Sequence, residues 1–569
     1  MHIDQRHGPD GALPPRVREA LDAFAAARGS MGTVALPVPE RPWTPTEEQL
    51  RCAQASGPAT LVVAGAGCGK SSVVDMRLDA LSAAGVEAAS VLCLSFTNAA
   101  ADHLRELHPG VQSQTVASWT KERFEGVAPG VALAPAETFA NITQADPRLT
   151  RCADIVRQGT LGRRGAALSC VEEVTGDPDG ILGALEEVGI ADLVMQAAVV
   201  LAMNGRTGSG GISHVIVDEA QDNSAVDLLL VLSFCTAYGA SLFIVGDACQ
   251  SLYEFRDASP DTLLALASSG VFETLTLSTN FRSSPEVLRC ANALLGVMES
   301  NRDSRIVLRC PEGTDTGSCS WVDYRHRRVH PLRKDVAGQV VRAAWEKATQ
   351  TLAADGSVGL LAKTNAHADE LAEAAREAWP WARVVRPGSP QKAPATVLSR
   401  YLAQFGDVVS LMEGPGLVPM VERHVIGHLG DLGCGEDRAT ASQVSAWASW
   451  AMSQGVSDMR GLTRSIAFFE SSLSDETDGN PSVEEGPTVV CTTVHGAKGL
   501  EYDCVAVPLN ALDTDEADLR CDYVALTRAR RHLVAVGCVR EPMAEEVGEA
   551  PLGSVRRACN SDDGDKGNR

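Results

Sequence analysis

Short apolar runs recur along the chain, and most are rich in β-branched residues and end at a polar or glycine-containing turn. Continuous runs of this kind, rather than alternating ones, are typical of strands buried on both faces of a parallel sheet. Helical patterns follow several of the turns, so the chain predicts an α/β fold with parallel sheets. The predicted strands cover residues 61–64, 91–95, 214–217, 241–245, 275–277, 358–362, 488–492, 504–507 and 532–536.

Two long intervals interrupt this alternation. Residues 118–212 and about 395–480 carry helical patterns without a strong strand, and we interpret each as a helical insertion. The acidic stretch 474–485 indicates a loop or disorder. Residues 1–43 are Pro-rich, with a short amphipathic helix expected over 17–28. For them a loosely tethered tail is favoured over a partner-docking arm.

The stretch from 61 to 72 is the strongest chemical signal, because a buried strand runs into a glycine-rich turn and then a helix. Glycines let backbone N–H groups face phosphates, Lys70 adds a charge at the β- and γ-phosphates, and Ser71 offers a hydroxyl to Mg²⁺. Ala64 stands where the strict G-x-x-x-x-G-K-[ST] pattern has Gly, so a turn without a ligand is the alternative. The candidate nucleotide-binding residues here are Ala64, Gly65, Ala66, Gly67, Cys68, Gly69, Lys70, Ser71 and Ser72.

Carboxylates follow the strand at 214–217 directly. Asp218 can hold Mg²⁺, and Glu219 can orient and deprotonate an attacking water. An acidic pair alone commonly faces solvent, but its place after a strand and downstream of a phosphate loop favours catalysis. Gln250 follows the strand at 241–245 and is placed to touch a γ-phosphate or its water.

Aromatic and basic residues alternate just after Gln250, in Tyr253, Phe255 and Arg256. This alternation is typical of platforms on which nucleic-acid bases stack. For Phe255, core packing is the alternative.

The bulk composition limits the remaining possibilities. The formal net charge of -23 argues against a protein that simply coats nucleic acid, though it leaves room for a local basic groove. None of the 16 cysteines forms a C-x-x-C pair, which disfavours zinc ribbons and iron–sulfur clusters and indicates a reducing, cytoplasmic compartment. No apolar run approaches the length of a membrane span.

In this order, the blocks resemble the UvrD/Rep/PcrA type of superfamily-one DNA helicase. The resemblance covers roughly residues 43–540. Its motifs are matched at Gln49, the phosphate loop, residues 95–98, 217–222, 246–253, 280–283, 363–365, 495–501 and 523–529.

The resemblance implies two RecA-like P-loop NTPase domains with parallel sheets, each carrying a helical insertion, and ATP with Mg²⁺ between them. The first domain would comprise residues 44–117 and 213–280 around an insertion at 118–212. The second would comprise 281–394 and 486–540 around a short insertion and linker at 395–485. An N-terminal extension at 1–43, partly disordered, and a flexible tail at 541–569 complete the expected division.

Family roles transfer to matched positions. Gln49 would read adenine, and Phe281 would stack on it. Lys70, Ser71 and Asp218 would hold phosphates and Mg²⁺, and Glu219 would be the catalytic base. Gln250, Arg282 and Arg528 would contact the γ-phosphate, the two arginines from the opposite domain, and Glu501 the sugar or phosphates. The single-strand path would be lined by Phe96, Asn98, Tyr253, Phe255, Arg256 and His495.

The chain departs from the family pattern in several places. Ala248 and Cys249 stand where acidic residues are usual, Phe255 replaces a common Trp, and Ala117 replaces a His that commonly touches DNA. The second insertion also looks much shorter than in typical unwinding members.

The leading hypothesis is an ATP-dependent helicase that moves 3′ to 5′ on single-stranded DNA in repair, replication or recombination. Single-stranded DNA and single/double-strand junctions would be its partners, with a nuclease as an optional protein partner and no membrane. The alternative is a DNA-sensing ATPase component of an antiviral nuclease–helicase complex with little unwinding of its own. A non-catalytic binding module is disfavoured because the catalytic residues named above are all present.

Overall fold

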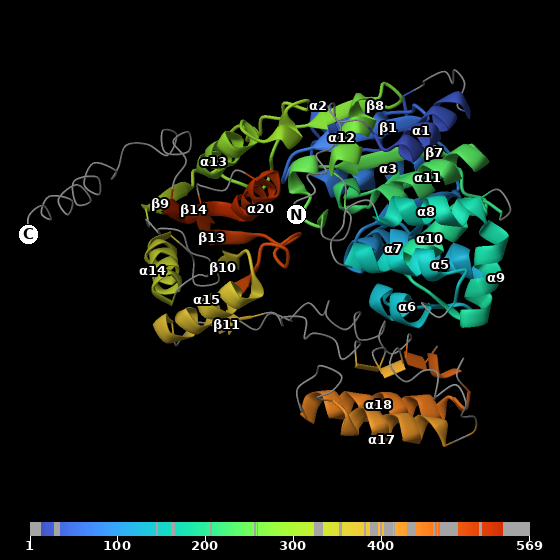
Figure 1. The fold of residues 1–569 in the computed structure, drawn as a ribbon. Coiled ribbons are helices and arrows are strands. Elements are labelled where there is room, and N and C mark those ends of the chain that lie inside the picture. The colour runs from blue at the N-terminus through green and yellow to red at the C-terminus, as the bar shows by residue number, and fades with distance from the viewer. Residues whose placement is uncertain are drawn as a thin grey trace, which may run out of the picture.

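The computed structural model consists mainly of two six-stranded sheets that lie side by side (Figure 1). The structure describes residues 13–538 except 28–34, 144–145, 161–165, 205–207, 255–257, 259, 324–333, 352–355, 380–382, 387–396, 399–400, 403–413, 415, 430–437, 459–460, 464, 467–487 and 511–514. Phe255 and Arg256, the segment 474–485 and the tail 541–569 therefore lie outside the described residues.

The first sheet has the strand order β3-β2-β6-β7-β1-β8, and all its neighbouring strands are parallel. Its inner strands are buried along nearly their whole length, as their continuous apolar runs predict. The strands are β1 (Ala59–Ala64), β2 (Val91–Ser95), β3 (Gln112–Thr115), β6 (His214–Val217), β7 (Ser241–Gly246) and β8 (Glu273–Leu277). The associated helices are α2 (Glu47–Gln54), α3 (Lys70–Ala83), α4 (Asn98–Leu107), α11 (Ala225–Tyr238) and α12 (Pro260–Ser268).

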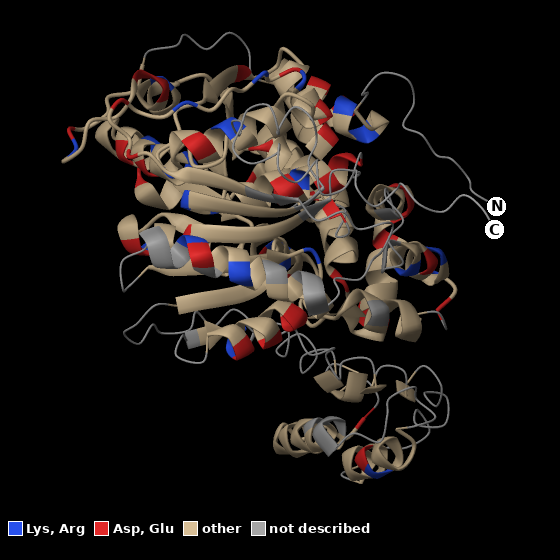
Figure 2. Ribbon diagram, turned by 90° about the vertical axis from the view of Figure 1, so that its left-hand side faces the viewer, with Lys and Arg blue, Asp and Glu red and all other residues tan. Residues whose placement is uncertain are grey.

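The second sheet is also fully parallel, in the order β11-β12-β10-β13-β14-β9. Charged residues gather on the helices of the fold rather than on its strands (Figure 2). The strands are β9 (Ser318–Asp323), β10 (Ser357–Ala362), β11 (Arg383–Val385), β12 (Thr488–Thr493), β13 (Tyr502–Asn510) and β14 (Ala529–Cys538). The associated helices are α13 (Pro285–Leu295), α14 (Lys334–Thr351), α15 (Asn365–Ala378) and α20 (Glu516–Leu526).

Helices fill the chain between β3 and β6 and share one hydrophobic core with the first sheet. The sequence shows no strong strand here, but the structure contains β4 (Ala132–Leu133) and β5 (Ile190–Ala191), which pair in parallel. Two-residue strands are too short to produce a periodic pattern. The helices are α5 (Val116–Val127), α6 (Ala136–Ile142), α7 (Thr150–Thr160), α8 (Ala166–Gly176), α9 (Pro178–Val188) and α10 (Leu193–Ala202).

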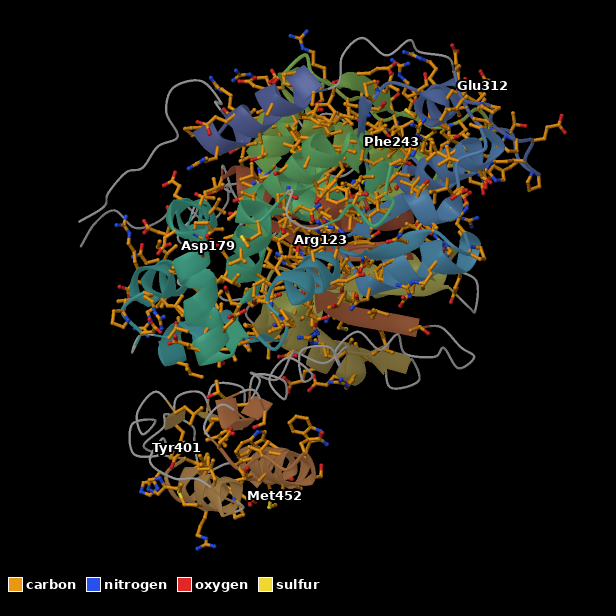
Figure 3. The ribbon with its side chains drawn as sticks, turned by 90° about the vertical axis from the view of Figure 1, so that its right-hand side faces the viewer. Arg123, Asp179, Phe243, Glu312, Tyr401 and Met452 are labelled. Carbon is orange, nitrogen blue, oxygen red and sulfur yellow. The ribbon has the colours of Figure 1, made fainter. Side chains whose placement is uncertain are left out.

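A smaller helical unit contains α17 (Leu417–Gly427) and α18 (Arg438–Ser453) and lies below α6 in Figure 1, with Ile142 of α6 packed against it. It has its own hydrophobic core, in which Tyr401 and Trp447 are fully buried. Tyr401 and Met452 mark this unit in Figure 3, whereas Arg123 and Phe243 belong to the larger body.

The N-terminal helix α1 (Pro15–Ala27) packs against α11. Val17, Leu21 and Phe24 are buried, and the Phe24 ring lies 6.1 Å from that of Phe272. The expectation of a loosely tethered tail is therefore wrong for this segment, because its apolar stripe completes the core of the first half. Among the described residues, no helix combines the length and apolarity needed to cross a bilayer.

Candidate nucleotide and nucleic-acid sites

The turn from β1 into α3 contains Gly65, Gly67 and Gly69 and ends at the start of a 14-residue helix. Gly69 is the N-cap of α3 at φ 79°, and without a side chain it makes no capping hydrogen bond. Gly67 also has positive φ, at 67°. A Cβ atom on Gly67 would lie 2.6 Å from the Asn280 amide nitrogen and 2.9 Å from the Arg282 Cβ, so this position favours glycine. Such an uncapped helix start is suited to an anion.

The other predicted nucleotide-binding residues of the loop lie in or next to the turn between β1 and α3. Ala64 ends β1, Ala66 and Cys68 are buried, and Ser71 and Ser72 are in the first turn of α3 with Ser71 exposed. Gln49 is buried in α2, where it forms a capping box with Thr46. Its Nε2 atom lies 2.8 Å from where a Cβ on Gly69 would stand, so Gln49 lies against the loop.

Residues from other segments hold the phosphate loop. The Ala66 N–H donates to the Tyr523 hydroxyl at 3.1 Å, while the Asn280 side-chain amide donates to the Ala66 carbonyl at 2.6 Å. The Phe281 N–H donates to the Gly67 carbonyl at 2.9 Å. The loop is thus held by the segment that follows β8 and by α20 of the second half.

Asp218 and Glu219 follow β6 and face Lys70. Glu219 has φ 49°, an uncommon backbone conformation for a residue with a side chain, and such strain tends to occur at functional sites. The Lys70 ammonium lies 3.7 Å from a Glu219 carboxylate oxygen.

The two neighbouring carboxyl groups differ in acidity. Burial, and then the Glu219 charge, raise the pKa of Asp218 to about 7. Burial also acts to raise the pKa of Glu219, but Lys70, Lys498 and other groups outweigh it and lower this pKa to about 2. The neighbouring lysine therefore keeps Glu219 ionised, as a general base requires.

Gln250 connects this group with Arg528 from the second half. The Gln250 side-chain NH₂ group donates to Asp247 at 2.5 Å, and the Gln250 side-chain oxygen lies 3.4 Å from an Arg528 guanidinium nitrogen. Arg528 is 2% exposed. Burial and the nearby Arg282 lower the pKa of Arg528 to about 9. The guanidinium is thus a buried cation aimed at the site from across the interface.

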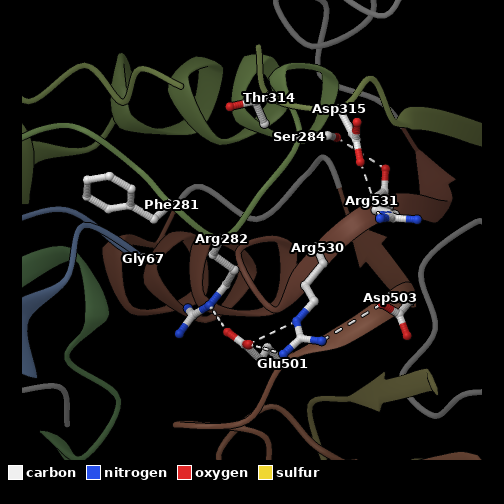
Figure 4. A pocket seen from close by; sticks show the side chains of 10 residues that line it. All are labelled: Gly67, Phe281, Arg282, Ser284, Thr314, Asp315, Glu501, Asp503, Arg530 and Arg531. Carbon is white, nitrogen blue, oxygen red and sulfur yellow. Dashed lines mark hydrogen bonds and ion pairs between the residues drawn. The ribbon is translucent and has the colours of Figure 1, made fainter. Parts of the chain in front are cut away.

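A cavity of about 520 Å³ opens beside the loop at Gly67 (Figure 4). Phe281, 51% exposed, stands at its rim. Arg282 Nε donates to Glu501 at 2.6 Å, and Arg530 reaches the same carboxylate from the other side. The cavity is lined by Gly67, Phe281, Arg282, Ser284, Thr314, Asp315, Glu501, Asp503, Arg530 and Arg531.

Three of the predicted nucleic-acid residues form one aromatic cluster across the interface. The ring centroids of Phe96 and Tyr253 are 4.8 Å apart, and those of Tyr253 and His495 are 5.9 Å apart. The His495 Nε2 lies 3.0 Å from the Leu252 carbonyl. Asn98 is exposed at the start of α4. All three rings are partly exposed, as a stacking surface requires.

Another group of potential metal ligands contains Asp75, Asp79 and His108. Arg41 forms ion pairs with both carboxylates, and the His108 Nε2 lies 2.7 Å from Asp75. The guanidinium already supplies a positive charge there, so this cluster is explained as an ion-pair network.

Comparisons with known protein families match both halves of the site. Residues 48–256 match an AAA domain, and residues 488–536 match a UvrD-like helicase C-terminal domain. The first region contains the phosphate loop and Gln250, and the second contains Glu501 and Arg528. These two matches, together with the helicase relatives described below, support the resemblance to the UvrD/Rep type of superfamily-one helicase. The predicted fold class, α/β with parallel sheets in P-loop helicase domains, is confirmed.

The individual relatives that the chain resembles are distant. The ATP-dependent DNA helicase UvrD1 of Mycobacterium tuberculosis is 25% identical over 312 residues, which cover 44% of this chain and 39% of the relative. The ATP-dependent DNA helicase Rep of Salmonella typhimurium is 28% identical over 142 residues, or 24% and 21% of the two chains. One component of the ATP-dependent helicase/nuclease of Staphylococcus carnosus is 35% identical over 104 residues, or 17% and 8%. The matched part is thus well under half of each relative.

The structure adds three residues to which motif matching gave no role. Tyr523 and Asn280 hold the phosphate loop, as described above. Lys498 forms an ion pair with Asp222 and donates to the backbone carbonyl of Gln250 at 2.9 Å. Its ammonium also lies 5.3 Å from the centre of the Tyr253 ring. Each belongs to a recognised UvrD/Rep-type motif, but its partner lies hundreds of residues away, so the sequence alone did not reveal the contact.

Proposed function

We propose that this chain is an ATP-dependent DNA helicase that moves 3′ to 5′ along single-stranded DNA. One observation carries the proposal. The Arg528 guanidinium from the second half lies 3.4 Å from Gln250, in a group that also contains Lys70 and Glu219 from the first half. A site that needs both halves can couple hydrolysis to their relative movement, which is how a motor uses ATP.

The chemistry of the donors fits ATP with Mg²⁺. The loop glycines, on which a Cβ would collide with neighbours, allow phosphates to approach the backbone. Lys70 would bind the phosphates, and the Ser71 hydroxyl with the Asp218 carboxylate would hold the cation. Bound Mg²⁺ would neutralise phosphate charge and orient the terminal phosphate. Gln49 and Phe281 would take the adenine.

Within this arrangement, Glu219 would accept a proton from the attacking water. Gln250 would position that water or the γ-phosphate, and Arg528 with Arg282 would stabilise the charge that develops there. Because Arg528 is already buried at the interface, it needs little reorganisation to do so.

The aromatic cluster of Phe96, Tyr253 and His495 supports single-stranded DNA as the track. Base stacking on such rings is largely independent of sequence. Lys498 touches this cluster and the Gln250 backbone together, so a base stacked on Tyr253 and the phosphate end of the site share one neighbour. The 3′-to-5′ direction and a role in repair, replication or recombination are what the family resemblance implies, and the cytoplasmic location is proposed from the cysteine pattern.

Streptavidin displacement tests the direction. The purified chain with ATP and Mg²⁺ should displace streptavidin from the 5′ end of a biotinylated single strand and leave it at the 3′ end. The opposite preference, with hydrolysis intact, would contradict the direction but not the ATPase. The same strands as RNA test the choice of nucleic acid.

A second candidate function is a DNA-sensing ATPase within a nuclease–helicase complex. Matches to components of bacterial helicase/nucleases support it, as does the small separate core around α17 and α18. A small insertion makes few phosphate contacts with duplex, so its grip should be weak. The deciding measurement is single-turnover unwinding of a 3′-tailed duplex at near-physiological salt. Efficient opening of long duplex by the chain alone would exclude this candidate.

A further inference from the structure

The Glu501 carboxylate lies between two arginines that approach it from opposite sides (Figure 4). The Arg282 Nε donates to Oε2 at 2.6 Å, and the Arg530 Nε donates to Oε1 at 2.9 Å. Arg530 also forms a second contact with Oε1 through its Nη2 atom. One carboxylate thus neutralises only one of two guanidinium charges at the edge of the nucleotide cavity.

This sharing constrains the proposed role of Arg282. In the structure Arg282 donates through Nε to Glu501 and through Nη1 to the Thr527 carbonyl at 3.4 Å, so a contact with the terminal phosphate of a nucleotide bound at Gly67 and Lys70 would compete with these bonds. Arg282 is 19% exposed and Glu501 33%, so neither is fully solvated. Leaving the Glu501 carboxylate unpaired in this partly buried place costs more free energy than in bulk water. This cost opposes movement of Arg282 away from Glu501.

We propose that Arg530 is a positioning residue that keeps the Glu501 carboxylate paired, and thereby releases Arg282 to bind the terminal phosphate. The inference rests on the proposed ATP site and deepens it. Motif matching assigned no role to Arg530.

The surroundings of Arg530 fit this role. Its side chain is 47% exposed, and its other acidic neighbour, Asp503, is 3.9 Å away. Asp503 accepts hydrogen bonds from the Ser357 N–H and hydroxyl, both at 2.9 Å, so it is held in place without Arg530. Arg530 therefore serves Glu501 chiefly.

The adjacent Arg531 provides a matched control. It lines the same cavity, but it pairs with Asp315 at 3.3 Å, and both of those side chains are well exposed. Replacing Arg531 removes a positive charge from the same wall without touching Glu501.

The test compares affinity for ADP with affinity for a non-hydrolysable ATP analogue, in the presence of Mg²⁺. Arg282 would meet only the terminal phosphate, so Arg530→Gln should weaken analogue binding about fivefold to tenfold, as expected for one partly exposed charged contact. Affinity for ADP should change less than about twofold. Arg531→Gln also removes a positive charge from the cavity wall, but it should leave the ratio of analogue affinity to ADP affinity nearly unchanged.

A double variant separates this role from structural support. In Glu501→Gln with Arg530→Gln, no charge remains to retain Arg282. The ratio of analogue affinity to ADP affinity should then return toward the parental value, even if both affinities fall through loss of the Glu501 contact. A merely structural Arg530 would give no such recovery.

Equal weakening of ADP and analogue by Arg530→Gln, or no recovery in the double variant, would overturn the inference and leave the ATP site standing. No binding of either nucleotide by the parental chain would overturn the proposed function itself, and this inference with it.

Discussion

Two strand-to-helix turns of the molecule have similar local sequences and opposite chemistry. After β1, the chain passes through glycines to Lys70, and α3 begins with Gly69 as its N-cap and no side-chain cap. After β10, the chain passes through Lys363 to Thr364, whose hydroxyl accepts from the His367 N–H and caps α15. No side chain caps the start of α3, and we call this turn open. A side chain caps the start of α15, and we call that turn closed.

The two lysines differ in the same way. Lys363 is held by Asp518 at 2.9 Å and Asp522 at 3.2 Å, both on α20. Lys70 lies 3.7 Å from Glu219 and is buried next to the open helix start. A strand, a lysine and a helix start are therefore insufficient for a phosphate site. The glycines that leave the backbone N–H groups available make the difference.

The largest expected effect comes from exchanging each lysine in turn for alanine. Lys70→Ala should reduce ATP hydrolysis by at least about 100-fold, because its charge acts directly on the phosphates. Lys363→Ala should lower the free energy of unfolding by about 1 kcal/mol or less and reduce hydrolysis far less, since its ion pairs are partly exposed. Steady-state ATPase assays and denaturant unfolding of both variants check this. Comparable losses of ATP hydrolysis in the two variants would contradict the proposed difference between the two turns.

Arg528 faces the first turn and should matter for turnover more than for binding. Arg528→Ala should cut the hydrolysis rate by about 10³-fold while ATP affinity changes little, because the guanidinium stabilises charge that develops in the transition state. Rapid-quench kinetics with ATP-binding measurements give both numbers. Hydrolysis at the parental rate would remove Arg528 from the site.

A side chain at the open turn should partly close it. Gly69→Ala places a methyl group 2.8 Å from the Gln49 amide at a positive φ, and we expect nucleotide affinity to fall about tenfold. Gly85→Ala is the matched control, because Gly85 also has positive φ but no atom within 4 Å of the added carbon. An unchanged nucleotide affinity in Gly69→Ala, or an equal loss in Gly85→Ala, would contradict this prediction.

The smallest effect belongs to the closed turn. Thr364→Ala removes the cap of α15 and should lower the free energy of unfolding by about 1 kcal/mol, with nucleotide affinity unchanged. Urea unfolding and nucleotide titration of the same sample measure both quantities. A loss of nucleotide affinity would mean that the closed turn also serves the site.

Local signals explain what the sequence could predict. Most strands of both sheets appear as apolar runs, whereas β3, β9 and β11 were not predicted. The phosphate loop combines a strand, glycines and Lys-Ser within a dozen residues. Each of these signals lies within a few consecutive residues, so it can be recognised without knowledge of the fold. The β4–β5 pair has no comparable signal, because each strand is only two residues long.

Long-range contacts explain what the sequence could not predict. Tyr523 lies 457 residues from the Ala66 amide that donates to it, and the tyrosine looks in sequence like an ordinary core residue of α20. The apolar stripe of α1 was visible, but only the structure shows that α11 buries it. The pairing of Arg530 with Glu501 likewise requires β13 and β14 to be neighbours.

The central claim, that single-stranded DNA activates ATP hydrolysis at Glu219, is tested most directly by one comparison. ATP hydrolysis by the purified chain is measured with and without single-stranded DNA, alongside Glu219→Gln. The parental chain should hydrolyse ATP and be stimulated by DNA, whereas Glu219→Gln should bind ATP and hydrolyse almost none. No hydrolysis by the parental chain with DNA, or equal rates in the two proteins, would contradict the account.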